Sequence, residues 1–508
     1  MLNRIKSVFL IGASGLLLVV AGCKKGTFDI NDPNPNLPSS VSPKFVLSAA
    51  LNTTAALMQA GDADYANLYM GYWAVSGDYI PTSTTLTYNT TTTYYSDNWN
   101  TGYITLRNFK QIITLSGTDP NNNYYVAMAK IMMAFNYGRL IDQYNNLPYA
   151  QALLGGTENF PPYDDASAVY PSLIHQLDTA LILINSAPPT AVGAGNYDIM
   201  FKGDMSKWIL FANTVKLKLL MNLTQMPGGP AAIQAGLTGL TGASFLGAGQ
   251  DAKLNPGFTN AVVAQQSPFW QDMGFAPSGA VQGNNSYYRA CSYAVNYYNA
   301  TNDTVRQKLF YALNSNGIVQ GRQFGSIGAN EHNVVISAMG PGLLKSPSMD
   351  AVILPASESF FLQAEAIERG YLPGAAADAN AAYQKGVEES FRLLGDAGYV
   401  AHAAALTSQT GSASLQNQVN ITTSTNRIQT IITQAWAALN AYDPVESWSN
   451  WRRLNIPSDI PVSIYPGTTA THIPYRLLYP DTEYSYNATN VDAEGNINNL
   501  TSKIFWQP

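Results

Sequence analysis

The sequence has few of the side chains on which metal and nucleophilic sites usually depend. Among 508 residues there are only two cysteines and four histidines. No two histidines stand three or four positions apart, as ligands on one helix face would; they are His175, His332, His402 and His472. We therefore expect each to be a surface or hydrogen-bonded side chain, and we predict no metal site and no cofactor.

Charge is also scarce. Asp, Glu, Lys and Arg together make up 12% of the chain, about half the usual share. The net charge is −6, and the 27 lysines and arginines form no basic block. Binding to nucleic acid is therefore not expected.

Aromatic and small polar residues are abundant instead. The chain has 31 tyrosines and 8 tryptophans among many Asn, Thr and Ser residues, and 46% of it is hydrophobic, which is ample for a large core. A surface of this composition forms hydrogen bonds with little charge, which suits neutral polar ligands such as sugars or peptides. Alternatively, the tyrosines only decorate a helical surface.

The first 22 residues have the pattern of a secretory leader. Arg4 and Lys6 precede an apolar run over 8–20, and small residues precede Cys23. The run is too short to span a hydrocarbon core of ~30 Å. Small residue, Gly, then Cys resembles the lipobox of bacterial lipoproteins, which implies cleavage before Cys23 and acylation of that residue. In such lipoproteins the cysteine thiol carries two acyl chains and the new N-terminal amine carries a third. Three chains exceed the two signals that stable membrane anchoring needs. The alternative is an ordinary signal peptide with a chance cysteine.

Residues 23–40 follow as a tether. This segment is rich in Asn, Asp, Pro and Ser, and its spaced prolines keep it extended. If Cys23 is acylated, Cys291 is the only remaining thiol and no intramolecular disulfide forms. Residues 41–508 are predicted to form the folded body.

Helical signals recur along this body. Capping residues followed by apolar residues at spacings of three and four predict helices from Pro43 and over 62–73, 124–140, 165–185, 204–223, 354–370, 378–394 and 425–440. Trp208 lies on an apolar stripe and is predicted to be a core anchor. In the pair at 354–394, Gly370 and Gly395 stand where left-handed backbone ends a helix. Gly386 inside the second helix costs ~1 kcal/mol relative to alanine, so we expect a close helix crossing there.

Residues 79–99 (YIPTSTTLTYNTTTTYYSDNW) have little helical periodicity. A loop this long in a compact chain is usually functional or disordered. Aromatic side chains in irregular chain form the candidate ligand-stacking platform, which comprises Trp73, Tyr79, Tyr94, Tyr95 and Trp99, with Tyr287 and Tyr288 as reserves. In the alternative, some of them fill the core beneath the loop, and for Trp99, at a possible helix start, the two interpretations are nearly balanced.

An enzymatic interpretation depends on paired carboxylates. Glu358 and Glu365 are seven positions apart on one predicted helix, hence about 10.5 Å apart along its axis. Glycosidase pairs lie closer, at ~5–9.5 Å. Glu365 also precedes Arg369 by four positions, which favours a helical ion pair. No G-x-S-x-G elbow, P-loop or dinucleotide fingerprint appears in context. We therefore predict structural roles for both glutamates. A lipid-anchored hydrolase is the least favoured functional hypothesis.

Several blocks of sequence occur together in one order. They lie at 29–34, 142–153, 198–223, 357–370, 446–457 and 473–506. Examples are Asp142-Gln143-Tyr144 with Leu147-Pro148-Tyr149, Lys207-Trp208 with Phe211-Ala212-Asn213, and Glu446 with Trp448 and Arg452-Arg453. In this order the blocks resemble the SusD/RagB family of nutrient-binding outer-membrane lipoproteins of Bacteroidota, in particular its SusD-like branch. In the 142–153 block, Asn145-Asn146 replaces the Gly-Asp of the family's pattern.

The resemblance implies an all-α fold of tetratricopeptide-like helix pairs, with a loop-rich, irregular ligand-binding region. It implies a cell-surface protein in the outer membrane that binds a glycan, starch-like or other, and delivers it to a SusC-like TonB-dependent transporter barrel. Such proteins have no catalytic chemistry of their own. The alternative within the family is the same architecture binding peptides. Contact with the membrane would be through the lipid anchor only.

Overall fold

Helices make up most of the regular structure of this chain. The computed structural model describes residues 42–79, 82–156, 158–240, 242–328 and 331–508. The predicted leader (1–22), the acylation site Cys23 and the tether (23–40) lie outside the described residues. Among the residues described, no helix combines the length and the apolar content needed to cross a bilayer. The predicted all-α class is confirmed.

The helices of the first half are α2 (Pro43–Ala56), α3 (Asp62–Tyr69), α4 (Ser83–Thr87), α5 (Ser96–Ser116), α6 (Asn123–Tyr144), α7 (Ala166–Asn185), α8 (Met205–Asn222) and α9 (Gly229–Gly236). Those of the second half are α10 (Pro268–Met273), α11 (Gly283–Tyr287), α12 (Ser292–Ala300), α13 (Thr304–Phe310), α14 (Ala356–Glu368), α15 (Ala376–Leu393), α16 (Tyr399–Thr407), α17 (Ala413–Val419), α18 (Arg427–Leu439), α19 (Pro444–Leu454), α20 (Asp481–Tyr486) and α21 (Ala488–Ala493).

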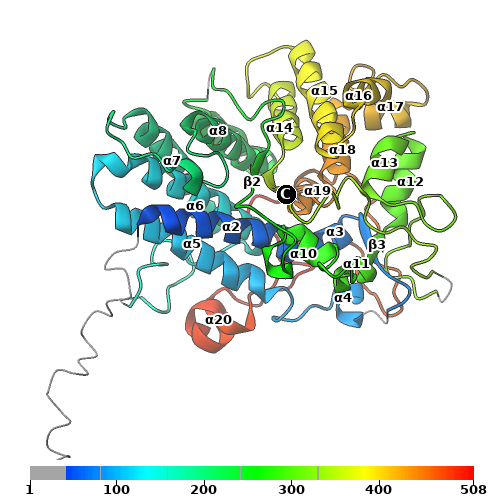
Figure 1. Cartoon of the computed structure of the whole chain (residues 1–508), viewed down its shortest axis with the longest axis horizontal. Helices are drawn as coiled ribbons and strands as arrows, with labels where there is room; N and C mark the ends of the chain where they lie inside the picture. Colours follow the sequence, from blue (N-terminus) through cyan, green and yellow to red (C-terminus); the bar gives the residue numbers. More distant parts are fainter. Residues whose placement is uncertain (1–41, 80–81, 157, 241, 329–330) are drawn as a thin grey trace, which may run out of the picture. The chain divides into compact units, whose positions relative to one another are not determined.

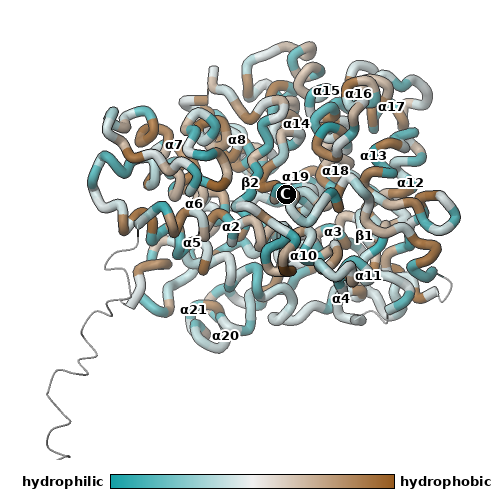
Figure 2. Tube along the Cα trace, in the orientation of Figure 1, coloured by the Kyte–Doolittle hydropathy of each residue, from teal (hydrophilic) through white to brown (hydrophobic). Residues whose placement is uncertain are grey.

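Neighbouring helices pack as pairs. α5 packs against α2 and α6, α6 against α7, and α14 against α15. Figure 1 shows the first group on the left of the molecule and α14, α15 and α18 at the upper right. Apolar stretches run through these helices, whereas the tube through α20 and α21 is mostly pale in Figure 2, where Ser, Thr and Tyr of intermediate hydropathy are frequent. The paired helices therefore enclose the core.

Local capping explains several helix ends. The Asp204 side chain accepts hydrogen bonds from the N–H groups of Ser206 and Lys207 at the start of α8, and Asp165 accepts one from Ser167 at the start of α7. Trp208 is fully buried, as predicted. Asp378 lies inside the first turn of α15 rather than before it, and accepts a hydrogen bond from the N–H of Ala375 at 2.7 Å.

Two expected features of the 354–394 pair are confirmed. Gly370 and Gly395 have positive φ angles, 74° and 88°, and each lies two positions after the last residue of its helix, α14 or α15. A Cβ atom on Gly386 would lie 2.8 Å from Cε1 of Phe361 on α14. Because that separation is shorter than van der Waals contact, only glycine permits α14 and α15 to cross this closely.

In the described part of the chain, four short strands form two small antiparallel sheets. β1 (Trp73–Val75) pairs with β3 (Tyr288–Ala290), and β2 (Ala252–Leu254) pairs with β4 (Ala351–Leu354). The predicted helix over 62–73 was therefore wrong at its end, since α3 stops at Tyr69. Trp73 lies opposite Ala290 in the sheet, and a strand partner so distant along the chain leaves no local signal.

Candidate ligand-binding site

The loop predicted to bind ligand is fixed by the C-terminal part of the chain. The Tyr88 hydroxyl accepts a hydrogen bond from the N–H of Ser463 at 3.0 Å, and the Asn499 amide donates one to the Tyr88 carbonyl at 2.8 Å. The N–H of Asp481 donates to the Thr92 carbonyl at 3.1 Å. These bonds join distant parts of the sequence, so the loop conformation depends on the complete fold.

Two tyrosines of this loop have left-handed backbone. The φ angle is 58° at Tyr88 and 52° at Tyr95. A residue other than glycine in this region costs ~1–3 kcal/mol, and the conformation persists only where the surroundings impose it. Tyr95 immediately precedes α5, and its carbonyl accepts a hydrogen bond from the N–H of Asn98 at 3.0 Å. The turn into α5 thereby presents Tyr94 and Tyr95 side by side.

Tyr94 and Tyr95 line a groove of about 450 Å³, which we call the threonine groove. Their rings meet edge to face, with centroids 4.7 Å apart, and the Tyr95 ring packs in the same way on buried Tyr65 at 4.9 Å. The other lining residues are small and polar, apart from the single carboxylate of Asp97; they are Thr82, Thr84, Thr85, Thr91, Thr93, Ser96, Asp97 and Asn98.

The lining threonines were not among the predicted ligand residues. The run of threonines in 82–93 is the sequence signal that could have identified them. Some of their hydroxyls bond to one another, as Thr91 and Thr93 do at 2.8 Å. Hydroxyl groups both donate and accept hydrogen bonds, so a groove of this lining matches a ligand that is itself rich in hydroxyl groups.

Tyr79 and Tyr287 form a second aromatic step next to the groove. Their ring centroids are 5.3 Å apart in an edge-to-face arrangement. Tyr79 is 40% exposed. Burial raises the pKa of Tyr287, whereas a hydrogen bond with Thr82 lowers it. Because Thr82 also lines the groove, this contact places the pair at one end of it.

The other predicted platform residues are inside the protein. Trp73, Trp99 and Tyr288 are 0%, 2% and 6% exposed. Trp99 packs against four tyrosine rings, and its indole N–H donates a hydrogen bond to Glu483 at 3.2 Å. Rings buried on this scale offer no open face for stacking in this conformation. They belong to the core, which corresponds to the alternative left open for the loop aromatics.

Asp64 lies close to Tyr94 and Tyr288, and Asp272 lies close to Asp64. Burial raises the pKa of Asp64, and Asp272 raises it further. Burial likewise raises the pKa of Asp272 to about 6, while its hydrogen bond with Asn284 opposes the shift. Neither residue lines the groove, so Asp97 is the only carboxylate there. A glycosidase mechanism needs two carboxyl groups flanking the bond that is cleaved, and the groove lining does not contain that arrangement.

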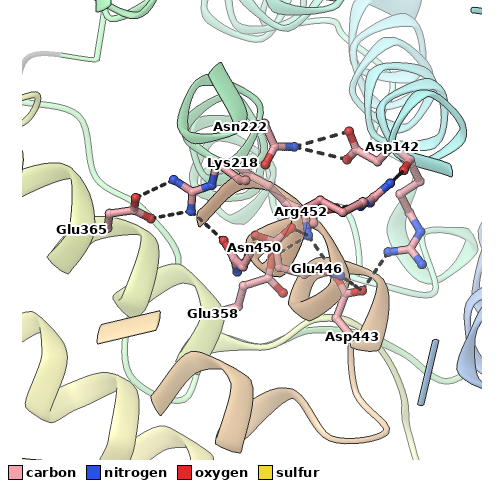
Figure 3. A network of polar contacts seen from close by, with 12 residues as sticks. Asp142, Lys218, Asn222, Glu358, Glu365, Asp443, Glu446, Asn450 and Arg452 are labelled. Atoms are coloured by element: carbon pink, nitrogen blue, oxygen red, sulfur yellow. Dashed lines mark hydrogen bonds and ion pairs between the residues drawn. The ribbon is translucent and has the colours of Figure 1, made fainter. Parts of the chain in front are cut away.

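The densest group of charges lies elsewhere, in the interior (Figure 3). Lys218 Nζ is 2.7 Å from Glu358 Oε1, 3.0 Å from Asp443 Oδ2 and 3.0 Å from Glu446 Oε2. Burial raises the pKa of Glu358 to about 8. Burial also acts to raise the pKa of Asp443, but Lys218 and Arg139 hold it at about 2. Lys218 is thus the shared cation of three carboxyl groups.

This ionic cluster has no room for a substrate. The space bounded by Glu358, Glu365, Glu446 and Asn450 is about 10 Å³, roughly the room one water molecule needs. Glu365 pairs with Arg453 and, as predicted, with Arg369, whose Nε is 2.7 Å from Oε1. The two glutamates tested as a catalytic pair therefore both have structural partners: Glu365 pairs with two arginines, and Glu358 accepts a hydrogen bond from Lys218 at 2.7 Å.

The histidines lie in hydrogen-bonded positions where the structure shows their partners. Nδ1 of His402 is 2.6 Å from Asp396, and Nδ1 of His472 is 2.8 Å from the Ile473 carbonyl. His332 faces Asp78 at 2.5 Å. Within the described ranges, no group of three or more His, Cys, Asp or Glu side chains is placed to hold a metal ion.

Comparisons with known proteins agree with this architecture. A family model described as starch-binding and associating with the outer membrane matches residues 35–480. The fold is similar to that of a chitin-binding protein, at 22% identity and a TM-score of 0.73, over 92% of this chain and 100% of that chain. A comparison with curated proteins finds no match.

Two further solved structures are similar. One is a SusD-like protein from Bacteroides thetaiotaomicron, at 21% identity and a TM-score of 0.71, over 92% of this chain and 98% of that chain. The other is a chitin-binding SusD homolog from Flavobacterium johnsoniae, at 21% identity and a TM-score of 0.72, over 91% and 97% of the two chains. At this level of identity the likenesses show a shared fold.

Proposed function

Because the chain belongs to the SusD-like family, described as starch-binding and associating with the outer membrane, we propose that it is a lipid-anchored surface protein that binds a neutral glycan. It delivers the bound glycan to a SusC-like TonB-dependent transporter barrel. It carries out no catalysis in this proposal, and it needs no cofactor.

The threonine groove is the observation that carries this proposal. Two half-buried tyrosine rings form one wall, and five threonines and a serine supply hydroxyl groups around them. A sugar ring has an apolar face that packs on an aromatic side chain and hydroxyl groups that exchange hydrogen bonds with polar neighbours. The proposed contact residues are Tyr79, Tyr94, Tyr95 and Tyr287, whereas Trp73, Trp99 and Tyr288 are core residues.

The proposed attachment uses the N-terminal segments. Residues 1–22 act as the leader, Cys23 is the acylated residue, and 23–40 is the tether that holds the body away from the bilayer. Mass spectrometry of the N-terminal peptide from native membranes measures this directly. A cleaved, acylated Cys23 supports the attachment, and an unmodified thiol on secreted protein contradicts it.

Calorimetric titration with malto- and chito-oligosaccharides tests the groove. Tyr79→Ala, Tyr94→Ala, Tyr95→Ala and Tyr287→Ala should each weaken binding, and Tyr94→Ala and Tyr95→Ala should do so by tenfold or more, equivalent to about 1.4 kcal/mol. Tyr486→Ala is the matched control, because this tyrosine is 73% exposed and does not line the groove. Unchanged affinity in all four groove variants would remove the groove as the site.

Three companion measurements test the remaining claims. Parallel titration with short peptides separates glycan binding from peptide binding, the alternative within the same fold. Incubation of the pure protein with any glycan that binds should leave its length unchanged, and cleavage would favour a hydrolase. Purification of the tagged protein from outer membranes should recover a barrel protein; its absence under conditions that retain other membrane complexes would contradict the transporter partnership.

A further inference from the structure

A second pocket lies among the helices of the C-terminal half. It has a volume of about 550 Å³, within the range of ~300–1,000 Å³ typical of small-molecule sites. Its walls come from α12, α17, α18 and the loop after α19. It shares no lining residue with the threonine groove, and in Figure 1 α17 and α18 lie well apart from α4, the helix of the groove.

Two tyrosines of α12 form an aromatic wall of this pocket. Tyr293 and Tyr297 are four positions apart, so their side chains lie on the same face of the helix. Both rings pack against buried Trp436, with centroid distances of 5.5 and 4.9 Å and near-perpendicular planes. The Trp436 ring is in turn stacked on Tyr72 at 5.1 Å. The wall is therefore backed by the protein core.

The hydroxyl groups of both tyrosines are already held. Tyr293 donates a hydrogen bond to Asp459 Oδ1 at 2.6 Å. Tyr297 accepts one from Gln434 Nε2 at 2.7 Å, and Gln434 Oε1 accepts one from the buried guanidinium of Arg306 at 2.7 Å. These bonds fix the ring orientations before any ligand arrives, which lowers the ordering cost of binding.

Three side-chain amides on three different helices border the same pocket. They belong to Asn296 on α12, Gln418 on α17 and Gln429 on α18. In the part of the chain that the structure describes, none of these amides forms a side-chain hydrogen bond with another protein group. Each offers two donors and an acceptor. Amides from separate helices thus surround the fixed rings with unused hydrogen-bonding capacity.

The charges of the lining select the class of ligand. Among the described residues, no lysine, arginine or histidine lines the pocket, and Asp459 is the only carboxylate of the lining. Phosphate, sulfate or carboxylate groups would find no cation there. A neutral molecule with an apolar face and several hydroxyl groups matches both the rings and the amides.

We propose that this pocket is a second saccharide-binding site, which takes one end of a neutral oligosaccharide between the tyrosine wall of α12 and the amides of Asn296, Gln418 and Gln429. The ligand class rests on the proposed function, but the site does not depend on the groove residues. A chain with two such sites holds a long glycan at two points, and the second contact then forms at high effective concentration.

Calorimetry and saturation-transfer NMR with maltohexaose and chitohexaose test the proposal on the intact folded body. We expect two binding sites for at least one probe. The double variant Gln418→Ala with Gln429→Ala should weaken one site by tenfold or more, and Tyr94→Ala should weaken only the other. Ser414→Trp, at an exposed position on the lining, should block the pocket by bulk without disturbing the core. Gln416→Ala, on the same helix but outside the lining, is the control.

The outcomes separate this proposal from the proposed function. One site that responds to Tyr94→Ala and to neither pocket variant overturns the second site and leaves the groove intact. One site that responds only to the pocket variants supports the pocket and contradicts the groove. Binding of peptides alone, or of neither probe, overturns the saccharide assignment of both.

Discussion

Arg453 and Glu365 form a two-point ion pair inside the helical body. Nη1 lies 2.5 Å from Oε1 and Nη2 lies 2.8 Å from Oε2, and both side chains are 1% exposed. Burial acts to raise the pKa of Glu365, but Arg453 and Arg369 hold it below its usual range. The pair joins α14 to α19, two helices that belong to different sequence blocks, so these motif residues hold the fold together.

Loss of this pair should therefore be costly. Arg453→Met leaves the buried Glu365 carboxylate with Arg369 alone, and removing one partner of a buried pair typically costs ~3–5 kcal/mol. Arg369→Met removes a cation whose side chain is 20% exposed, and should cost below ~1 kcal/mol. Urea unfolding of both variants measures the free energies. Equal losses would contradict the central role of Arg453.

Stability should also depend on the ionisation of Glu358. Burial raises the pKa of its carboxyl group to about 8, with Lys218 opposing and Asp443 adding to the shift. The unfolded chain, in which the pKa is near the ordinary value of 4.5, releases this proton first. Between about pH 5 and pH 8 the folded state therefore binds more protons than the unfolded state. The free energy of unfolding consequently falls as the pH rises through this range.

Glu358→Gln isolates this effect. The amide oxygen can still accept a hydrogen bond from Lys218, but the side chain has no proton to lose. Because a pKa difference of one is equivalent to about 1.4 kcal/mol, the variant should match the wild type near about pH 5 and exceed its unfolding free energy by a few kcal/mol near about pH 9. Urea titrations across this range measure the difference. Parallel pH profiles for the two proteins would show that Glu358 is ionised in the folded state throughout.

The sequence predicted most of the long helices because their signals are local, but for α5 (Ser96–Ser116) it indicated only a possible start at Trp99. The Asp204 cap and the apolar stripe that follows are sufficient to define α8, and Gly370 marks the end of α14. In irregular segments, by contrast, the direction of a side chain is determined by residues that are distant in the sequence. Trp99 faces inward because Glu483, 384 positions later, accepts its indole hydrogen bond. The density of aromatic residues thus indicated the region that contains Tyr94 and Tyr95, but it did not distinguish rings that line the groove from rings that are buried in the core.

The second pocket is even less accessible to prediction from sequence. Its amides come from α12, α17 and α18, so no single stretch of sequence contains the pattern. Gln418 and Gln429 are ordinary polar residues of their own helices. Only the packing of the three helices brings their side chains to one pocket beside Tyr297.

The close crossing of α14 and α15 predicts the effect of a small substitution. Gly386→Ala would gain ~1 kcal/mol of helix propensity, but the new methyl group would lie 2.8 Å from the Phe361 ring. Overpacking of a core typically costs ~1–3 kcal/mol, so we expect a net loss of stability and a lower Tm. In a Phe361→Leu background the same change should be less harmful, since the smaller side chain makes room. An equal loss in both backgrounds would show that the contact is not its cause.

Cys291 should be inert in the folded protein. Its side chain is 1% exposed, and burial raises the pKa of the thiol to about 11. The thiolate is the reactive form, so both access and ionisation oppose modification at about pH 8. In a Cys23→Ser variant, a chromogenic disulfide reagent should therefore react slowly with native protein and rapidly, with one thiol per chain, after unfolding in guanidinium chloride. The double variant with Cys291→Ala should show no reaction in either state. Rapid reaction of the native Cys23→Ser protein would mean that the junction of β3 and α12, where Cys291 lies, opens readily and does not form a rigid base for the tyrosine wall of α12.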